Sequence, residues 1–182
     1  MTFHIDDFSY SRRRGPLAAA DSRHFQIRLH DQTIGLPVDC VKTVFHVDNL
    51  TPVPLAPAEV AGLVNLRGRV VTTLHLDRCL WLDPSKGARA DRLAVGVEHN
   101  GEVYALLIDA TDDVVAISED DRIRCPAHID PRLRELLSGC YRIGQDFLSI
   151  LDVGALLRRV MKSSEATLRE SRRGAPAKGA GK

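Results

Sequence analysis

The stretch that decides the fold is Gly62-Leu-Val-Asn-Leu-Arg-Gly-Arg-Val-Val-Thr-Thr-Leu-His-Leu76. Two apolar runs flank Arg67-Gly68-Arg69, and this pattern predicts two strands joined by a tight turn. Gly68 is the natural turn residue, because a residue without a Cβ reaches positive φ at little cost. The turn would hold Arg67 at an exposed tip, where a guanidinium on a stiff hairpin is well suited to bind a partner. The alternative is a solvated charge without a specific role, which describes most surface arginines.

The composition is that of a soluble globular protein. The 182 residues, 44% hydrophobic and 27% charged, suit one domain or two small packed subdomains. No apolar run reaches the ~20 residues of a membrane span, so we expect no membrane insertion. Residues 1–15 place acids ahead of a basic cluster and contain no apolar segment, which argues against a signal peptide. We therefore expect a cytoplasmic protein.

Charge is distributed unevenly along the chain. Residues 25–157 hold 13 Lys/Arg and 19 Asp/Glu, whereas the two ends hold the other 12 Lys/Arg and 5 Asp/Glu. Basic ends can bind nucleic acid, anionic lipid or an acidic partner, but they are more often solvated and disordered. We expect a flexible lead at residues 1–22 and a basic, disordered tail at residues 161–182.

The rest of the sequence predicts the same arrangement in each half of the chain: a hairpin, a longer connecting segment and a second hairpin. Alternating apolar residues at 25–29 and 34–38 indicate the first hairpin, and 62–76 forms the second. In the second half, strands flank the turn Asn100-Gly101, and a last hairpin spans 141–151. The polar run Asp83-Pro-Ser-Lys-Gly87 places a subdomain boundary near 83–90.

Neither half of the chain is large enough for a big core, so each would close a small barrel that packs against the other. A helix is expected after the cap residue Asp152, and its apolar stripe is Val153, Leu156, Leu157, Val160 and Met161. Asp130-Pro131 predicts a short helical turn. The four cysteines, Cys40, Cys79, Cys125 and Cys140, lack CxxC spacing and are expected to be reduced packing residues.

The sequence offers little that resembles catalytic chemistry. It contains no phosphate-binding glycine loop and no G-x-S-x-G elbow. His75 and Cys79 are four residues apart, but His75 lies in a predicted strand, so we expect no metal site. The acidic body and the 5% aromatic content argue against nucleic-acid binding. We expect no catalytic residue, no metal and no cofactor.

The segment Gly62 to Val71, followed by Leu74-His-Leu, resembles the signature of the CheW family of chemotaxis coupling proteins, G-x-x-N-L-R-G-x-x-x-P-x-x-D-L-R. Ile108 to Val114 resembles the family's V-D-x-V-x-D-V segment, and Gly139 to Leu157 its closing hairpin and helix. The likeness covers about residues 23–158. The chain departs from the family pattern at Thr72, His75, Asp77, Ala110 and Thr111.

The resemblance implies a mainly β fold of two five-stranded SH3-like barrels with a shared apolar core and a C-terminal helix, over residues 23–160. It implies a non-enzymatic adaptor, monomeric when alone. Its partners would be a CheA-type histidine kinase and the cytoplasmic tips of methyl-accepting chemoreceptors, and it would be recruited to their membrane-associated arrays.

The resemblance also implies site residues. Those on the receptor side would be Val38, Val41, Gly62, Asn65, Arg67, Gly68 and Val114. Those on the kinase side would be Leu50, Val53 and Pro57. For the apolar positions, core packing is an equally good alternative.

The departures leave the receptor and the kinase open, and they allow a divergent scaffold of another pathway, such as one for surface motility. A small-molecule sensor on the same barrels is another alternative function. A nucleic-acid or membrane-surface protein that acts through the basic ends is a third.

Overall fold

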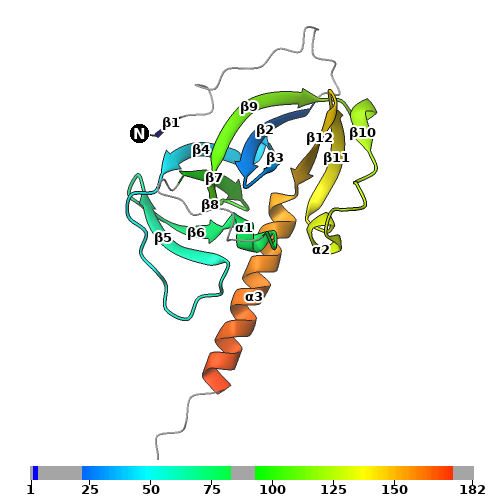
Figure 1. Cartoon of the computed structure of the whole chain (residues 1–182). Coiled ribbons are helices and arrows are strands. Elements are labelled where there is room, and N and C mark those ends of the chain that lie inside the picture. Colours follow the sequence, from blue (N-terminus) through cyan, green and yellow to red (C-terminus); the bar gives the residue numbers. More distant parts are fainter. Residues whose placement is uncertain (1, 4–21, 83–92, 174–182) are drawn as a thin grey trace, which may run out of the picture.

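The computed structural model describes residues 2–3, 22–82 and 93–173 (Figure 1). The strands are β1 (Thr2–Phe3), β2 (Ser22–Leu29), β3 (Gln32–Pro37), β4 (Val41–His46), β5 (Val60–Leu66), β6 (Arg69–His75), β7 (Leu93–His99), β8 (Glu102–Ile108), β9 (Ala110–Ile117), β10 (Arg122–Ile123), β11 (Leu137–Ile143) and β12 (Asp146–Leu151). The helices are η2 (Val38–Cys40), α1 (Leu76–Cys79), η4 (Glu119–Asp121), α2 (Pro131–Arg134) and α3 (Val153–Arg173).

The strands form two sheets, as Figure 1 shows. The first sheet has the order β1-β4-β7-β8-β6-β5, and the second has the order β10-β11-β12-β3-β2-β9. In each sheet five strands of six to eight residues are joined at one edge by a strand of two residues, β1 or β10. The prediction of a mainly β protein with two five-stranded SH3-like units and a C-terminal helix is therefore confirmed.

The two sheets do not follow the two halves of the sequence. The first hairpin, β2–β3, lies in the second sheet, where β3 pairs in parallel with β12 and β2 pairs with β9. The first sheet contains a matching parallel pair, β6 with β8. The expected boundary near 83–90 lies outside the described residues, and the strands on either side of it, β6 and β7, belong to the same sheet.

Tight turns close the hairpins as the sequence predicted. Asn100 and Gly101 have φ of 53° and 81°, and Arg67 and Gly68 have φ of 52° and 82°. A two-residue turn of type I′ needs positive φ at both central positions. The sequence pointed to Gly68 alone, and the structure adds Arg67 in the same left-handed region.

One apolar core joins the two sheets. Its fully buried members include Phe25, Ile27 and Leu36 from the second sheet and Leu74, Val95 and Leu106 from the first. Each sheet also has a smaller cluster of its own: Phe45, Val47, Val64, Val71, Ala94, Ala105 and Leu107 in the first, and Ile117, Leu148 and Ile150 in the second. Each large side chain buried in this way contributes about 1.5–3 kcal/mol.

Helix α3 begins as predicted and then leaves the body of the molecule (Figure 1). Asp152 caps it, because its Oδ1 accepts a hydrogen bond from the Ala155 amide at 2.8 Å. Val153, Leu156, Leu157 and Val160 are at most 5% exposed, as the stripe predicted. Met161 is 51% exposed, so the prediction is wrong there, although its sulfur lies 3.9 Å from the Tyr104 hydroxyl of β8.

The two ends of the chain differ in part from the expectation. Helix α3 continues to Arg173, well into the segment 161–182 that was expected to be disordered. Residues 161–173 contain strong helix formers such as Ala166, Leu168 and Arg169, which favour continuation. At the other end, Thr2 and Phe3 pair with β4. Residues 4–21 and 174–182 lie outside the described part of the chain.

Candidate functional site

The tip of the β5–β6 hairpin is exposed and locally stiff. The Gly68 amide donates to Oδ1 of Asn65 at 2.8 Å, so the Asn65 side chain closes the turn across the two central residues. The side chains of Asn65 and Arg67 are exposed. The structure therefore brings three of the predicted receptor-side residues together at one turn, with Arg67 presented to solvent and Asn65 and Gly68 shaping the backbone.

Gly62 is buried behind the tip and has a packing role. Its φ is 150°, and a Cβ at this position would overlap the Thr51 carbonyl oxygen. Next to it, Thr51 and Leu63 form an isolated bridge, with amide-to-carbonyl distances of 2.9 and 2.8 Å. Gly62 therefore lets the loop of residues 47–59 approach β5 closely.

The predicted kinase-side residues lie on that loop, in two different environments. Leu50 packs against the small core cluster of the first sheet. Val53 is 38% exposed and begins a turn in which the Ala56 amide donates to the Val53 carbonyl at 3.3 Å. Leu55 sits in this turn with φ of 60° and is 73% exposed. Sequence reasoning missed Leu55, although Pro54 before it is typical of a turn that needs positive φ at the next position.

The three predicted valines belong to the junction of the two sheets. Val41 and Val114 are only 3% and 7% exposed and are members of the shared core. Val38 is half-buried in η2 and packs against the same core. Core packing accounts for Val41 and Val114 without a partner, whereas Val38 keeps an accessible part.

The departures from the family pattern make contacts of their own. Oδ2 of Asp77 lies 4.0 Å from Nε2 of His30, and the His30 amide donates to Asp109. The His75 amide donates to the Glu59 carbonyl at 2.8 Å. These contacts tie α1 and the β2–β3 turn to their surroundings, so the fold accommodates the changed residues.

A second network holds α3 against α1. From α3, Nη2 of Arg159 donates to the Cys79 carbonyl at 2.7 Å, and its Nη1 lies 3.7 Å from Oε1 of Glu59. Its guanidinium carbon is 4.2 Å from the centre of the Trp81 ring, and that of Arg132 is 4.8 Å from the same ring. Trp81 is therefore flanked by cations from α2 and α3.

Beside Trp81 lies a cavity of about 690 Å³, between the end of α1, the segment before α2 and the second sheet. Its buried lining is apolar: Ile34, Leu80, Ile129, Leu133 and Leu148. Its carboxylates are Asp31, Asp130 and Asp146, and Asp130 is already bound by Arg132 at 2.8 Å. The volume suits a small ligand, which keeps the sensor alternative testable.

The structure corrects the expectation for two cysteines. Cys125 and Cys140 are disulfide-bonded, with a Cα–Cα distance of 5.3 Å. The prediction of four reduced thiols is wrong for this pair, because the pairing of β10 with β11 brings together residues fifteen positions apart. Cys40 and Cys79 are free thiols, and burial raises their pKa to about 11 and about 12, so both stay protonated.

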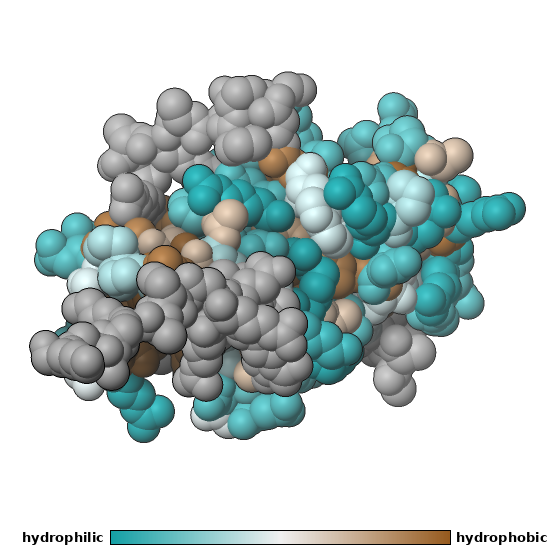
Figure 2. Space-filling model, turned by 90° about the horizontal axis from the view of Figure 1, so that it is seen from below, coloured by the Kyte–Doolittle hydropathy of each residue, from teal (hydrophilic) through white to brown (hydrophobic). Residues whose placement is uncertain are grey.

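Two further searches bear on the alternatives. Among the residues that the structure describes, no three His, Cys, Asp or Glu side chains are placed to hold a metal ion. Within the same residues, no helix combines the length and hydropathy that a membrane span needs. Figure 2, which views the molecule from the side on which α3 projects, shows mostly hydrophilic residues with hydrophobic ones in small spots between them.

Comparisons with known proteins agree on one family. The family model described as CheW-like domain matches residues 23–161. Chemotaxis protein CheW of Treponema pallidum is 28% identical over 150 residues, which cover 79% of this chain and 88% of that protein. Protein FrzA of Myxococcus xanthus is 27% identical over 150 residues, which cover 82% of this chain and 93% of that protein. The crystal structure of scaffolding protein TtCheW from Thermoanaerobacter tengcongensis superposes with a TM-score of 0.66 at 22% identity, covering 75% of this chain and 92% of that one.

Proposed function

The chain belongs to the CheW-like domain family, whose proteins are chemotaxis scaffolds and not enzymes, and on that premise we propose that it couples a CheA-type histidine kinase to the cytoplasmic tips of methyl-accepting chemoreceptors. An adaptor of this kind acts by raising the effective concentration of its partners, which needs two separate docking surfaces on one stable body. In this role it works in the cytoplasm and is recruited to membrane-associated receptor arrays.

The observation that supports the receptor surface is the geometry of the β5–β6 tip. Asn65 locks the turn, and Arg67 projects from it in an exposed position. Little conformational entropy is lost when a group on such a stiff turn meets a partner. A receptor tip is a helical hairpin, for which one charged anchor beside an apolar surface is a suitable match. The accessible part of Val38 supplies an apolar contribution.

The kinase surface is assigned to the turn that begins at Val53. Val53 and Leu55 are among the large hydrophobic residues that the structure leaves exposed. Apolar side chains held outward on a turn fit a protein partner better than they fit solvent. Leu50 and Pro57, the other two predicted residues, support this turn from the loop on either side of it.

The pathway served is a separate question. The similarity to protein FrzA, a relative with a different name, and the departures at His75 and Asp77 support a scaffold of a related signalling pathway, such as one for surface motility, as the second candidate. Both candidates use the same two docking surfaces and differ only in the partners.

The test is a binding measurement with purified partners encoded in the same genome. Arg67→Glu should fold as the wild type does and lose at least about tenfold in affinity for the receptor signalling domain, while affinity for the kinase changes less than about twofold. Arg69→Glu, an exposed arginine at the other side of the turn, is the matched control. Equal receptor affinity for the Arg67→Glu variant and the wild type would refute the assignment of the tip.

A further inference from the structure

The Cys125–Cys140 disulfide joins the core to a surface segment. Cys140 lies on β11, is fully buried and belongs to the shared core. Cys125 follows β10 and is partly exposed. It begins the segment of residues 125–130 that leads to α2. The bond therefore fastens the start of this segment to β11, the strand next to the edge strand β10 of the second sheet.

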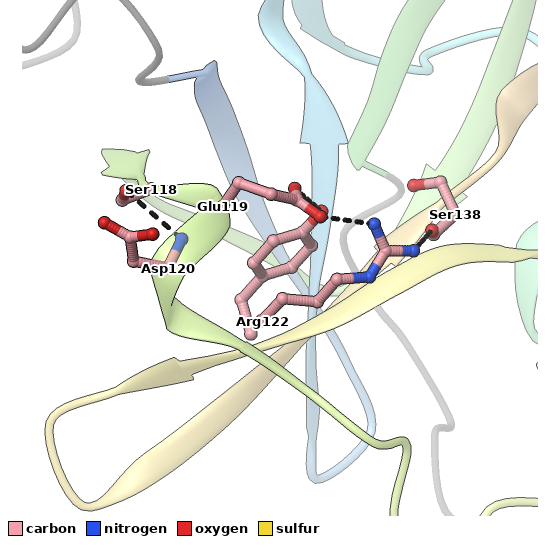
Figure 3. A network of polar contacts seen from close by, with 6 residues as sticks. Ser118, Glu119, Asp120, Arg122 and Ser138 are labelled. Carbon is pink, nitrogen blue, oxygen red and sulfur yellow. Dashed lines mark hydrogen bonds and ion pairs between the residues drawn. The ribbon is translucent and has the colours of Figure 1, made fainter.

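The other interactions that hold this region in place lie before and after the disulfide in the sequence. Before it, Oε1 of Glu119 binds Nη1 of Arg122 at 2.6 Å, Oε2 accepts from the Tyr141 hydroxyl at 3.0 Å, and Nη2 of Arg122 donates to the Ser138 carbonyl at 3.1 Å (Figure 3). This network holds β10 on β11. Hydrogen bonding to the Arg122 guanidinium and the Tyr141 hydroxyl lowers the pKa of Glu119, so the carboxylate stays charged in weak acid.

After the bond, the segment is held by hydrogen bonds within itself and to α2, by an edge contact of the His128 ring with the Phe147 ring of β12 at 6.0 Å, and by the Ile129 side chain. The Ile129 amide donates to the Pro126 carbonyl at 3.2 Å, and Nη2 of Arg134 donates to the same carbonyl at 3.3 Å. These bonds join the segment to itself and to α2. The Ile129 side chain is 9% exposed and reaches the shared core. Between β10 and Ile129, the disulfide is the covalent link of the segment to the sheet.

The fastened segment forms a wall of the cavity of about 690 Å³. His128, Ile129 and Asp130 all line this cavity, and Trp81 lines it as well. Arg132, which follows directly in α2, stacks over Trp81 and binds Asp130. A movement of the segment would therefore change both the shape of the cavity and the surroundings of the single tryptophan.

The cysteines of the chain also divide into an inert pair and a reactive pair. Cys40 and Cys79 are kept protonated by burial and cannot compete as nucleophiles. Cys125 is the partly exposed residue of the pair and offers the entry point for an attacking thiolate, whereas Cys140 is the leaving group that the core protects.

We propose that Cys125 and Cys140 form a reversible dithiol–disulfide switch that fastens or releases residues 125–130 and so sets the wall of the neighbouring cavity. In the reducing direction, one thiolate of an external dithiol attacks the Cys125 sulfur and breaks the bond to Cys140, which takes up a proton. The second thiol of the reductant then displaces Cys125, so the reductant leaves as a disulfide and both cysteines are thiols. In the oxidising direction, hydrogen peroxide takes two electrons and two protons from the pair and is reduced to two waters.

The test uses the full-length chain without a partner, so it is independent of the proposed adaptor function. The peroxide-treated chain should yield a linked Cys125–Cys140 peptide, and dithiothreitol without denaturant should make the Cys125 thiol available to iodoacetamide. Reduction should shift Trp81 emission and speed amide exchange in residues 125–130 by at least about tenfold, and peroxide should reverse both. Cys40→Ser is the matched control and should respond as the wild type does.

Three results would overturn the proposal. The first is absence of the linked peptide after peroxide treatment. The second is a bond that dithiothreitol opens only after the protein has been unfolded, which would make it a purely structural crosslink. The third is reduction that leaves both the Trp81 emission and the amide exchange of residues 125–130 unchanged. Because these readouts use the wild-type chain, they do not depend on whether a Cys125→Ser variant folds.

Discussion

Replacement of Arg159 by alanine tests whether the contacts between α3 and α1 hold the C-terminal helix in place. The Arg159 guanidinium makes one charged hydrogen bond, to the Cys79 carbonyl at 2.7 Å, and stacks on Trp81 at 4.2 Å. Its distance to Glu59 is 3.7 Å, with side-chain exposures of 26% and 18%. The substitution removes all three contacts and leaves the partly buried Glu59 without this ion pair.

The expected cost follows from the separate contributions. A hydrogen bond from a charged donor contributes about 1.5–3 kcal/mol and a partly desolvated cation–π contact about 0.5–2 kcal/mol. The ion pair adds about 0.5 kcal/mol or less at this distance and exposure. Because these contributions share one group and do not add, we expect Arg159→Ala to lower the free energy of unfolding by about 2–3 kcal/mol. For a chain of this size the melting temperature should fall by about 4–12 °C.

The assay is urea unfolding followed by far-ultraviolet circular dichroism, since Trp81 fluorescence would change with its own stacking partner. Arg158→Ala is the matched control, because Arg158 is the exposed neighbour on the same helix, and it should cost less than about 0.5 kcal/mol. Arg159→Lys keeps the charge but loses the planar stack, so it should fall between the two. If Arg159→Ala were as stable as Arg158→Ala, the reasoning from these contacts would be refuted.

Two further predictions concern a glycine and a histidine. Gly62→Ala should lower the free energy of unfolding by about 2–4 kcal/mol in urea titrations, because its backbone conformation is strained for other residues and its Cβ meets the Thr51 carbonyl. Gly68→Ala, where a Cβ meets nothing within 4 Å, should cost about 1 kcal/mol, and equal losses would contradict the argument. Burial holds the pKa of His24 below its usual 6.5, so the unfolded chain binds the proton more readily. The contribution of His24 to stability should therefore be constant above about pH 7 and fall as the pH drops through 6.5 and below; His24→Gln should lose this slope, and an unchanged slope would argue against it.

Local sequence signals predicted most of the hairpins and the caps. The Asn100-Gly101 turn, the Gly68 turn and the Asp152 cap each depend on one or two residues and their own backbone, so the sequence carries the whole signal. Sheet membership could not be predicted in the same way. It depends on the parallel pairs β3–β12 and β6–β8, which join strands far apart in the chain and leave no local mark.

In the candidate site, too, some features could be predicted from local sequence and others could not. The exposed position of Arg67 followed from the hairpin pattern alone. The burial of Val41 and Val114 did not, because an apolar residue in a strand looks alike in sequence whether it faces a core or a groove. The Cys125–Cys140 bond was missed for the reason that applies to the sheets, since it depends on the pairing of β10 with β11.

The backbone bridge between Thr51 and Leu63 links the two proposed docking surfaces. Leu63 lies on the strand that leads to the Arg67 tip, and Thr51 lies two residues before Val53. Gly62 permits this bridge without being accessible itself. A substitution at Gly62 that leaves the fold intact should therefore weaken receptor and kinase binding together, whereas Arg67→Glu should weaken receptor binding alone. Gly62, which the resemblance placed on the receptor side, would therefore affect binding through the geometry of the loop and the hairpin that it joins. It would do so without contacting either partner.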